Sequence, residues 1–271
     1  MTIKNLSILL IFCLFIFSSC SSDDDAGSTE TNNKNYFPLL VANNWDFENT
    51  LSAPNQDDVI TTEKLSVSGT VYNNGTEAYE LETDNPAGSG PVTLALSQGI
   101  LFSENSRLLY TGVFGLGLEG FPETNFDVEN MVIYDASLPN EAEMYSLSGN
   151  IEQEVQGFPI TINYTLSTIM GDLFGSFEVN GETYDDVINS QLKINIEVTA
   201  NITDPFPVTV TVLKSQDAIV ITNYFADEVG LIQSETDTNF IFETLPLINL
   251  PLEDIEFDTL QILTDYSVSM E

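Results

Sequence analysis

Apolar and polar residues alternate along most of the chain that follows Tyr36. Because successive side chains of a β-strand point to opposite faces of the sheet, this period of two is typical of strands with one buried and one solvated face. No amphipathic helix longer than two turns is recognisable. The pattern therefore predicts an all-β fold, a single large antiparallel sheet that is curved or forms an open barrel, with little helix. The clearest alternating segments are residues 64–71, 160–166, 192–199, 208–212 and 260–268.

Short turn signals separate the alternating segments. Asn180-Gly181 lies between Phe177 and Tyr184, and Asn74-Gly75 lies between two other apolar runs. Asn-Gly is favoured in the two-residue turns of β-hairpins because both positions require a positive φ. No stretch of linker-like composition divides residues 36–271, although their length could hold two small sandwiches. We therefore expect one antiparallel β domain from residue 36 to residue 271.

The N-terminus has the three parts of an export signal. Lys4 provides a basic start, residues 6–17 form an apolar run, and Ser18-Ser19 supplies small residues before Cys20. This order is typical of signal peptides. A transmembrane helix needs about 20 apolar residues, so the run is too short to span a bilayer. Residues 1–19 are therefore predicted to be a signal peptide that is removed.

The sequence Phe17-Ser18-Ser19-Cys20 resembles the lipobox of bacterial lipoproteins, with phenylalanine in place of the usual leucine. The resemblance implies cleavage before Cys20 and attachment of a diacylglyceryl group to its sulfur. Each buried methylene of such a chain contributes about 0.8 kcal/mol, and more than one chain makes the attachment stable. An ordinary secretory signal followed by a chance cysteine is the alternative. We expect Cys20 to be the lipid attachment site, with the membrane as a partner through this lipid.

Residues 20–35 are small, polar and without periodicity, which predicts a flexible acidic tether. Within it, five residues resemble the acidic export tag that directs lipoproteins of Bacteroidota to the outer face of the outer membrane: Ser21, Ser22, Asp23, Asp24 and Asp25. A solvated linker without a targeting role is the alternative. The resemblance implies a lipid-anchored protein of the outer membrane of a Gram-negative bacterium, exposed at the cell surface.

Composition narrows the chemistry that the chain can perform. It has 42 Asp and Glu against 6 Lys and Arg, a formal net charge of −36, so it repels nucleic acid and anionic lipid, which are bound through Lys and Arg. It has no histidine, which excludes Ser-His-Asp and Cys-His catalysis and His-ligated zinc. Its two cysteines, Cys13 and Cys20, fall in the signal and at the anchor, so the mature domain has no disulfide and no thiolate site. We expect no cofactor and no nucleic-acid partner.

Three motifs carry a family resemblance. Residues 36–47, with YFPL followed by NWDF, resemble the opening of many Bacteroidota lipoproteins, and Ala42 stands where those proteins have glycine. Residues 179–187 (VNGETYDDV) and 224–232 (YFADEVGLI) resemble two later segments of the same proteins. Together the motifs are similar to the TapB-like domains of unknown function. The resemblance implies an open antiparallel half-barrel like that of the LolA and LolB lipoprotein carriers, and it brings no catalytic residues.

Motifs that could indicate catalysis are weak. Residues 115–120 (GLGLEG) match the G-x-G-x-x-G of dinucleotide sites, but Pro122 follows and no helix is indicated, so we interpret them as a glycine-rich loop. Adjacent acids occur at Asp57-Asp58, Asp185-Asp186 and Glu253-Asp254. Two carboxylates about 5 to 9 Å apart can hydrolyse a glycoside, yet adjacent pairs arise by chance in so acidic a chain.

Calcium is the one metal that the composition leaves open. Ca²⁺ takes roughly six to eight oxygen ligands, and residues 82–85 (ETDN) form an acidic segment before a loop that contains Gly and Pro. The segment lacks the ordered spacing of an EF-hand. We therefore assign Ca²⁺ to no residues.

The sequence thus predicts a non-enzymatic binding or scaffold protein at the cell surface, with a glycan, a protein or a lipid as its ligand. The alternative is a carrier that holds a lipid or another apolar ligand in the concave face of the half-barrel. A carboxylate-based glycoside hydrolase is the third hypothesis. A continuous apolar cavity favours the carrier, exposed aromatic side chains favour a glycan-binding protein, and two converging acids favour the enzyme.

Overall fold

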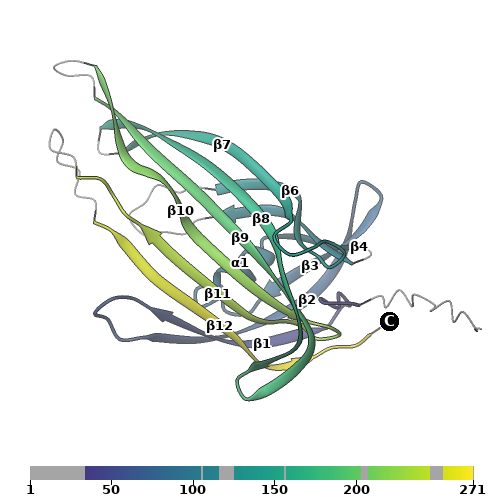
Figure 1. Ribbon diagram of the computed structural model, residues 1–271. Coiled ribbons are helices and arrows are strands. Elements are labelled where there is room, and N and C mark those ends of the chain that lie inside the picture. Colours follow the sequence, from purple (N-terminus) through teal and green to yellow (C-terminus); the bar gives the residue numbers. More distant parts are fainter. Residues whose placement is uncertain are drawn as a thin grey trace, which may run out of the picture. The chain divides into compact units, whose positions relative to one another are not determined.

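Twelve antiparallel strands form one continuous sheet in the part of the chain that the computed structural model describes (Figure 1). That part comprises residues 34–104, 106–115, 125–155, 157–202, 207–244 and 253–270, and it belongs to one compact unit, Asn33–Glu271. The predicted signal peptide, Cys20 and the export tag at residues 21–25 lie outside the described residues. The prediction of an all-β fold built on one large antiparallel sheet is confirmed.

The order of strands in the sheet follows the order of the chain. Each strand pairs with its neighbours in sequence, except that β6 and β7 do not pair with each other, and β1 pairs with β12. The first and last strands are therefore side by side, and the free edges of the sheet lie in the middle of the chain. The strands are β1 (Asn44–Ser52), β2 (Val59–Asn73), β3 (Thr76–Thr83), β4 (Gly99–Glu104), β5 (Arg107–Gly115), β6 (Asn125–Asp135), β7 (Glu143–Val155), β8 (Phe158–Val179), β9 (Glu182–Ile202), β10 (Val208–Ala226), β11 (Gly230–Phe240) and β12 (Ile255–Ser267), and one short helix, α1 (Pro91–Leu96), lies between β3 and β4.

The two edge strands meet at a seam that has no ladder of backbone hydrogen bonds. The hydroxyl of Thr168 in β8 donates to the carbonyl of Val132 in β6 at 2.7 Å. Met170 in β8 exchanges two backbone hydrogen bonds with the connection between β6 and β7, to Ala142 at 2.9 Å and from Glu141 at 2.8 Å. The sheet therefore curls almost into a closed barrel, further than the expected open half-barrel.

The alternation of residue types fixes which face of each strand lies inside. β9 buries every second residue from Ser190 to Ile202, and Leu192, Ile194 and Ile196 are among them. Burial of apolar surface stabilises the fold by roughly 25 cal/mol per Å². A shift of one residue in strand pairing would turn this whole face to water, so the apolar pattern also fixes the register.

Two hairpin turns have the backbone geometry that their residue types favour, and a third position does not. Asn74 and Gly75 have φ values of 50° and 87°, and Asn180 and Gly181 have values of 53° and 81°. Positive φ at both central residues is the geometry of hairpin turns, so both Asn-Gly predictions are confirmed. Ala42, which replaces a glycine of the resembled lipoproteins, has a φ of 78°, a region that favours glycine.

The segment before β1 packs into the core through its aromatic residues. Phe37 is fully buried, and its ring stacks on Trp45 at a centroid distance of 4.8 Å. The Trp45 Nε1–H donates to the carbonyl of Val229 at 2.6 Å. Gly230 has a φ of 118°, and a Cβ there would lie 2.7 Å from Trp45 Nε1. Both the backbone conformation and the close indole therefore require glycine at this position.

We predict that Trp45→Ala lowers the free energy of unfolding by about 3–5 kcal/mol, because it empties a fully buried ring site and leaves the Val229 carbonyl without its donor. Urea unfolding followed by far-ultraviolet circular dichroism measures this, since Trp45 is the only tryptophan. Tyr72→Ala is the control; Tyr72 is 75% exposed, and its loss should cost at most about 0.5 kcal/mol. Equal effects of the two substitutions on the free energy of unfolding would contradict the role of Trp45 in the core.

Candidate binding site

The helix α1 lies against the interior face of the sheet (Figure 1) and contacts β3, β4 and β5. Pro91 occupies its first turn, where the missing N–H of proline costs no hydrogen bond. Val92, Thr93 and Leu96 are its buried residues. Gly90 precedes the helix and provides no side-chain cap, so the free N–H groups of the first turn need another partner.

That partner is Glu63, a buried carboxylate of β2 that is only 4% exposed. Its Oε1 accepts hydrogen bonds from Gly90 N–H at 2.8 Å and from the Thr93 hydroxyl at 2.6 Å. The same oxygen accepts from the side-chain amides of Asn49 at 2.9 Å and Gln261 at 2.7 Å. Glu63 Oε2 accepts from the hydroxyl of Thr83 at 3.0 Å. Five donors, with the start of a helix among them, thus compensate one buried negative charge.

Glu63 also fixes the orientation of two side-chain amides. An amide has one acceptor oxygen and one donor nitrogen, and only the nitrogen can bond to a carboxylate. Asn49 and Gln261 therefore direct their NH₂ groups to Glu63, and their oxygens are left for other partners. Among the described residues, neither Asn49 Oδ1 nor Gln261 Oε1 has a hydrogen-bond partner, although both residues are buried.

The two amides belong to a row of buried polar residues that crosses four adjacent strands. Asn223 of β10 is paired in register with Ser234 of β11, Ser234 with Gln261 of β12, and Gln261 with Asn49 of β1. We call these four residues the acceptor row. One side-chain oxygen of each has no hydrogen-bond partner in the part of the chain that the structure describes, and neither has the hydroxyl of Thr236, two residues along β11.

A buried polar atom without a partner destabilises a protein by about 1–3 kcal/mol. Native proteins contain few such atoms per 100 residues, and each calls for an explanation such as a bound water, an ion or a ligand. Here four of them occupy neighbouring positions on one interior surface. Their concentration in one place distinguishes the acceptor row from scattered imperfections of packing.

Two cavities lie beside the ends of the acceptor row. The first is beneath α1, about 30 Å³ in volume for the centres of water-sized molecules, and Asn223 and Val92 line it. Its walls are mostly apolar, and Thr168, Ser190 and Tyr110 are the other lining residues with polar side-chain groups. The second has a volume of about 190 Å³, and Asn49 and Pro91 are among its lining residues. The start of α1 therefore separates the two cavities.

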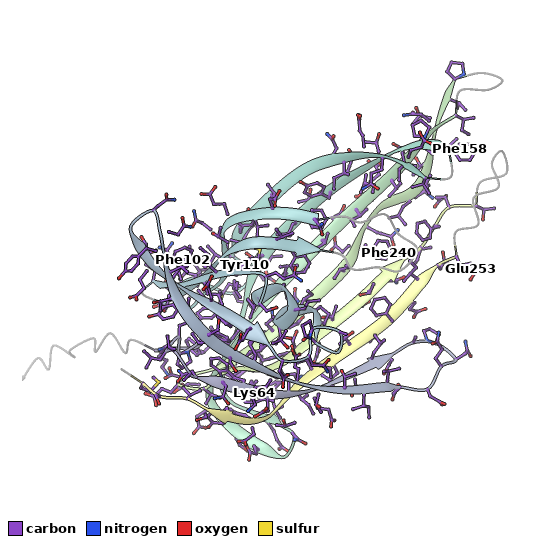
Figure 2. All side chains as sticks on the ribbon, turned by 180° about the vertical axis from the view of Figure 1, so that it is seen from behind. Lys64, Phe102, Tyr110, Phe158, Phe240 and Glu253 are labelled. Atoms are coloured by element: carbon purple, nitrogen blue, oxygen red, sulfur yellow. The ribbon has the colours of Figure 1, made fainter. Side chains whose placement is uncertain are left out.

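The other end of the helix is held by a tyrosine. That residue is Tyr110 of β5, which Figure 2 labels. Its hydroxyl lies 2.8 Å from the carbonyl of Ala95 and 3.1 Å from that of Val113. Burial raises the pKa of Tyr110 to about 12, against a smaller lowering effect of a backbone hydrogen bond with Val113. The phenol therefore stays protonated at neutral pH and remains a donor to the helix.

Four other tyrosines also have raised pKa values, and burial is the largest cause in each. The pKa of Tyr36 rises to about 12 with help from the nearby charges of Asp227 and Asp186. The pKa values of the remaining three are raised as well, those of Tyr134, Tyr184 and Tyr224. A hydrogen bond to Glu182 adds to the effect at Tyr184.

The acid pairs noted in the sequence lie on three different elements. All six residues are exposed: Asp57, Asp58, Asp185, Asp186, Glu253 and Asp254. Asp58 accepts a hydrogen bond from the Ser52 hydroxyl at 2.7 Å in the turn after β1. Asp186 in β9 forms an ion pair with Lys34 at 2.5 Å. Asp254, just before β12, accepts from the Phe242 N–H at 2.9 Å.

The acidic segment at residues 82–85 makes hydrogen bonds to a neighbouring strand. Asp84 accepts from the N–H of Lys64 at 2.8 Å, and the Asn85 amide donates to the carbonyl of Thr62 at 2.9 Å. Within the described ranges, no group of three or more His, Cys, Asp or Glu side chains is placed to hold a metal ion. Of the glycine-rich motif, Gly115 ends β5 and residues 116–120 lie outside the described residues.

Glu63 was not predicted to be a site residue, although the sequence pattern indicates that it is buried. The alternation over residues 64–71 places Leu65 and Val67 on one face of their strand, and Glu63 is the next residue on that face. An acid in phase with apolar neighbours is expected to be buried, and a buried acid requires donors. The identity of those donors was not readable, because they come from four separate segments.

Comparison with known proteins identifies neither a family nor a function for this chain. No family model matches the sequence, and no curated protein matches it. One solved structure that matches is a crystal structure at 2.70 Å resolution of a protein from Parabacteroides distasonis, described as a candidate lipoprotein. The alignment covers 86% of this chain and 99% of that chain, with 11% identity and a TM-score of 0.36. A TM-score this low supports neither a fold nor a function.

One structural observation concerns helices that could span a membrane. Among the described residues, no helix is long and apolar enough to cross a membrane.

We predict that Glu63→Ala lowers the free energy of unfolding by about 2–4 kcal/mol, because several buried donors lose their acceptor. Glu63→Gln should cost less, since its oxygen can still accept several of these bonds. The helix should also loosen, so the Leu94 N–H, which bonds to Gly90 O, should exchange faster with deuterium. Urea unfolding and hydrogen exchange measure the two effects.

Glu77→Ala is the matched control, because Glu77 is an exposed glutamate of the neighbouring strand β3. Its removal should change stability by at most about 0.5 kcal/mol. If Glu63→Ala behaved like Glu77→Ala, Glu63 would not hold α1 in place.

Proposed function

We propose that this chain is a lipid-anchored, non-catalytic binding protein of the outer membrane that holds a small ligand with apolar parts inside its curved sheet, beside α1. The anchoring part of the proposal rests on the signal peptide, the lipobox ending in Cys20 and the acidic residues that follow it. The binding part rests on one observation: a mostly apolar cavity under α1 adjoins a row of buried polar atoms that lack partners. Mostly apolar walls with a few oriented polar groups are typical of small-molecule sites.

The present volume limits what the site holds while α1 is in place. The cavity under α1 is about 30 Å³, enough for a water molecule, whereas occupied ligand sites span about 300–1,000 Å³. A ligand with an acyl chain must therefore displace part of the helix. A six-residue helix is marginal without tertiary contacts, and α1 depends on Glu63 and Tyr110 at its two ends. Displacement of α1 is thus the step that opens the interior.

A role without catalysis agrees with the placement of the acids. Hydrolysis of a glycoside needs two carboxyl groups facing each other across a cleft. Both oxygens of Glu63 are occupied by donors from the protein. Asp135, the other buried carboxylate of the described residues, accepts bonds from the backbone and side chain of Ser137 at the end of β6.

A second candidate function comes from an aromatic patch on the outer face of the sheet. Phe177 stacks on Tyr224 at 4.6 Å, and Phe174 contacts both rings. These three rings are half-buried, and the neighbouring Leu173 is 69% exposed. Stacked rings on a surface favour the glycan or partner protein that the sequence analysis put first.

We expect the mature chain, residues 20–271 with Cys20→Ser, to bind the neutral apolar dye N-phenyl-1-naphthylamine with a saturable rise in fluorescence. Ala95→Leu, which fills the cavity under α1, should weaken this binding by about tenfold or more. Tyr224→Ala, in the outer patch, should leave it unchanged. The reverse pattern would move the site to the outer patch, and no saturable binding by any variant would sink the interior site.

The anchor has a separate test in the native host. Wild-type chain should incorporate labelled palmitate and partition into the detergent phase of Triton X-114, because a diacylated cysteine is strongly apolar. Cys20→Ser should abolish both. Detergent partitioning that survives the substitution would disprove anchoring at Cys20. Protease treatment of whole cells then reports whether the chain faces outward.

A further inference from the structure

We propose that the acceptor row binds the polar end of the ligand, and that this end is a hydrogen-bond donor, an ammonium group or a set of hydroxyl groups. The inference rests on the proposed function, because it names the chemical class of ligand for the same site. It follows from the orientation of the amides, the electrostatics of the interior and the shape of the site.

Asn49 and Gln261 are each held in one orientation. Their NH₂ groups are committed to Glu63 at 2.9 and 2.7 Å, so each presents only its oxygen to a ligand. Asn223 contributes a third unpartnered amide oxygen at the far end of the row. An amide oxygen accepts and cannot donate. The ligand that satisfies these atoms must therefore bring N–H or O–H groups, and a carboxylate or phosphate brings none.

The hydroxyls in the row adapt to either kind of partner. Ser234 Oγ and Thr236 Oγ1 have no hydrogen-bond partner among the residues described, and a hydroxyl donates or accepts as required. They add capacity for a ligand with several hydroxyl groups. The polarity of the site is set by the three amide oxygens.

The charge beside the acceptor row is negative. Glu63 places a negative charge one hydrogen bond away from both amides. Among the described residues, no basic side chain forms an ion pair with Glu63. Lys34, Lys64, Arg107 and Lys214 form ion pairs with other acids, and Lys193 lies on the other face of β9. Opposite charges attract strongly where water is excluded, so this field favours an ammonium and disfavours an anion.

Gln261 also lies against the start of α1. A Cβ at Gly90 would lie 2.9 Å from Gln261 Oε1 and 2.8 Å from the amide carbon, so the amide packs directly on the Gly90 backbone. Gly90 has a φ of −65°, which any residue adopts, so this close contact and not the backbone conformation requires glycine there. Displacement of α1 by a ligand therefore uncovers Gln261 Oε1. Leu192 of β9 and Ile221 of β10, which line the cavity, provide apolar walls nearby for the rest of the ligand.

The experiment compares three probes that share one chain and differ in their polar end: octylamine, octanol and octanoate. Each competes with N-phenyl-1-naphthylamine for the mature chain with Cys20→Ser, at neutral pH and at high salt, which screens the acidic surface. Octylamine and octanol should displace the dye, and octanoate should need about tenfold more or higher concentration. The comparison is repeated with Ser234→Ala combined with Asn223→Leu.

This double variant removes two partnerless oxygens and leaves every contact of Glu63 intact. It should stay folded and bring the three probes to within about threefold of one another. Ser148→Ala, which removes an exposed hydroxyl on β7, is the control and should keep the wild-type preference.

Each outcome decides the matter. A preference for donors that the double variant loses and Ser148→Ala keeps supports the inference. Equal displacement by all three probes in the wild-type chain overturns it and leaves interior binding standing. Failure of all three against a bound dye also overturns it, because the row then holds ordered water only. If the double variant keeps the preference for donors, the selectivity comes from the acidic surface, and the acceptor row does not cause it. Absence of dye binding disproves the proposed function itself.

Discussion

A carboxylate buried away from water must be surrounded by hydrogen-bond donors, and Glu63 meets this constraint with donors from four separate parts of the chain. The strands β1, β3 and β12 and the start of α1 are all tied to this one charge. The same bonds hold the helix in the interior and turn the oxygens of Asn49 and Gln261 toward other partners. The position of the helix and the polarity of the candidate site are therefore consequences of a single buried group.

The rest of the architecture provides the enclosure in which that charge acts. Pairing of β1 with β12 joins the two ends of the sheet, and the seam between β6 and β7 is bridged through Thr168 and Met170 of β8. The aromatic residues Phe37 and Trp45 bind the segment before β1 into the core. The residues of the acceptor row are buried inside this sheet, so their unpartnered polar atoms carry a free-energy cost that a ligand can remove.

Several elements of the fold were readable from the sequence for physical reasons. Period-two alternation in β9 and the Asn-Gly turns at residues 74–75 and 180–181 are local signals, and each has the predicted structure. The seam was not readable, because alternation determines which side of a strand is buried and carries no information on how far a sheet curls. Of the candidate site, only the burial of Glu63 could be predicted, because Glu63 is in phase with Leu65. Its partners could not be predicted, because they are distant in sequence.

The sequence by itself determined the all-β class, the apolar face of each strand, the hairpin turns and the chemistry excluded by the lack of histidine, since these depend on residue type and local spacing. It also carries the predicted anchor at Cys20, which lies outside the described residues. Only the tertiary structure decided that Asn223, Ser234, Gln261 and Asn49 form one row and that Glu63 orients two of them. Register between strands far apart in the chain brings these residues together, and register is settled by the packing of the whole sheet.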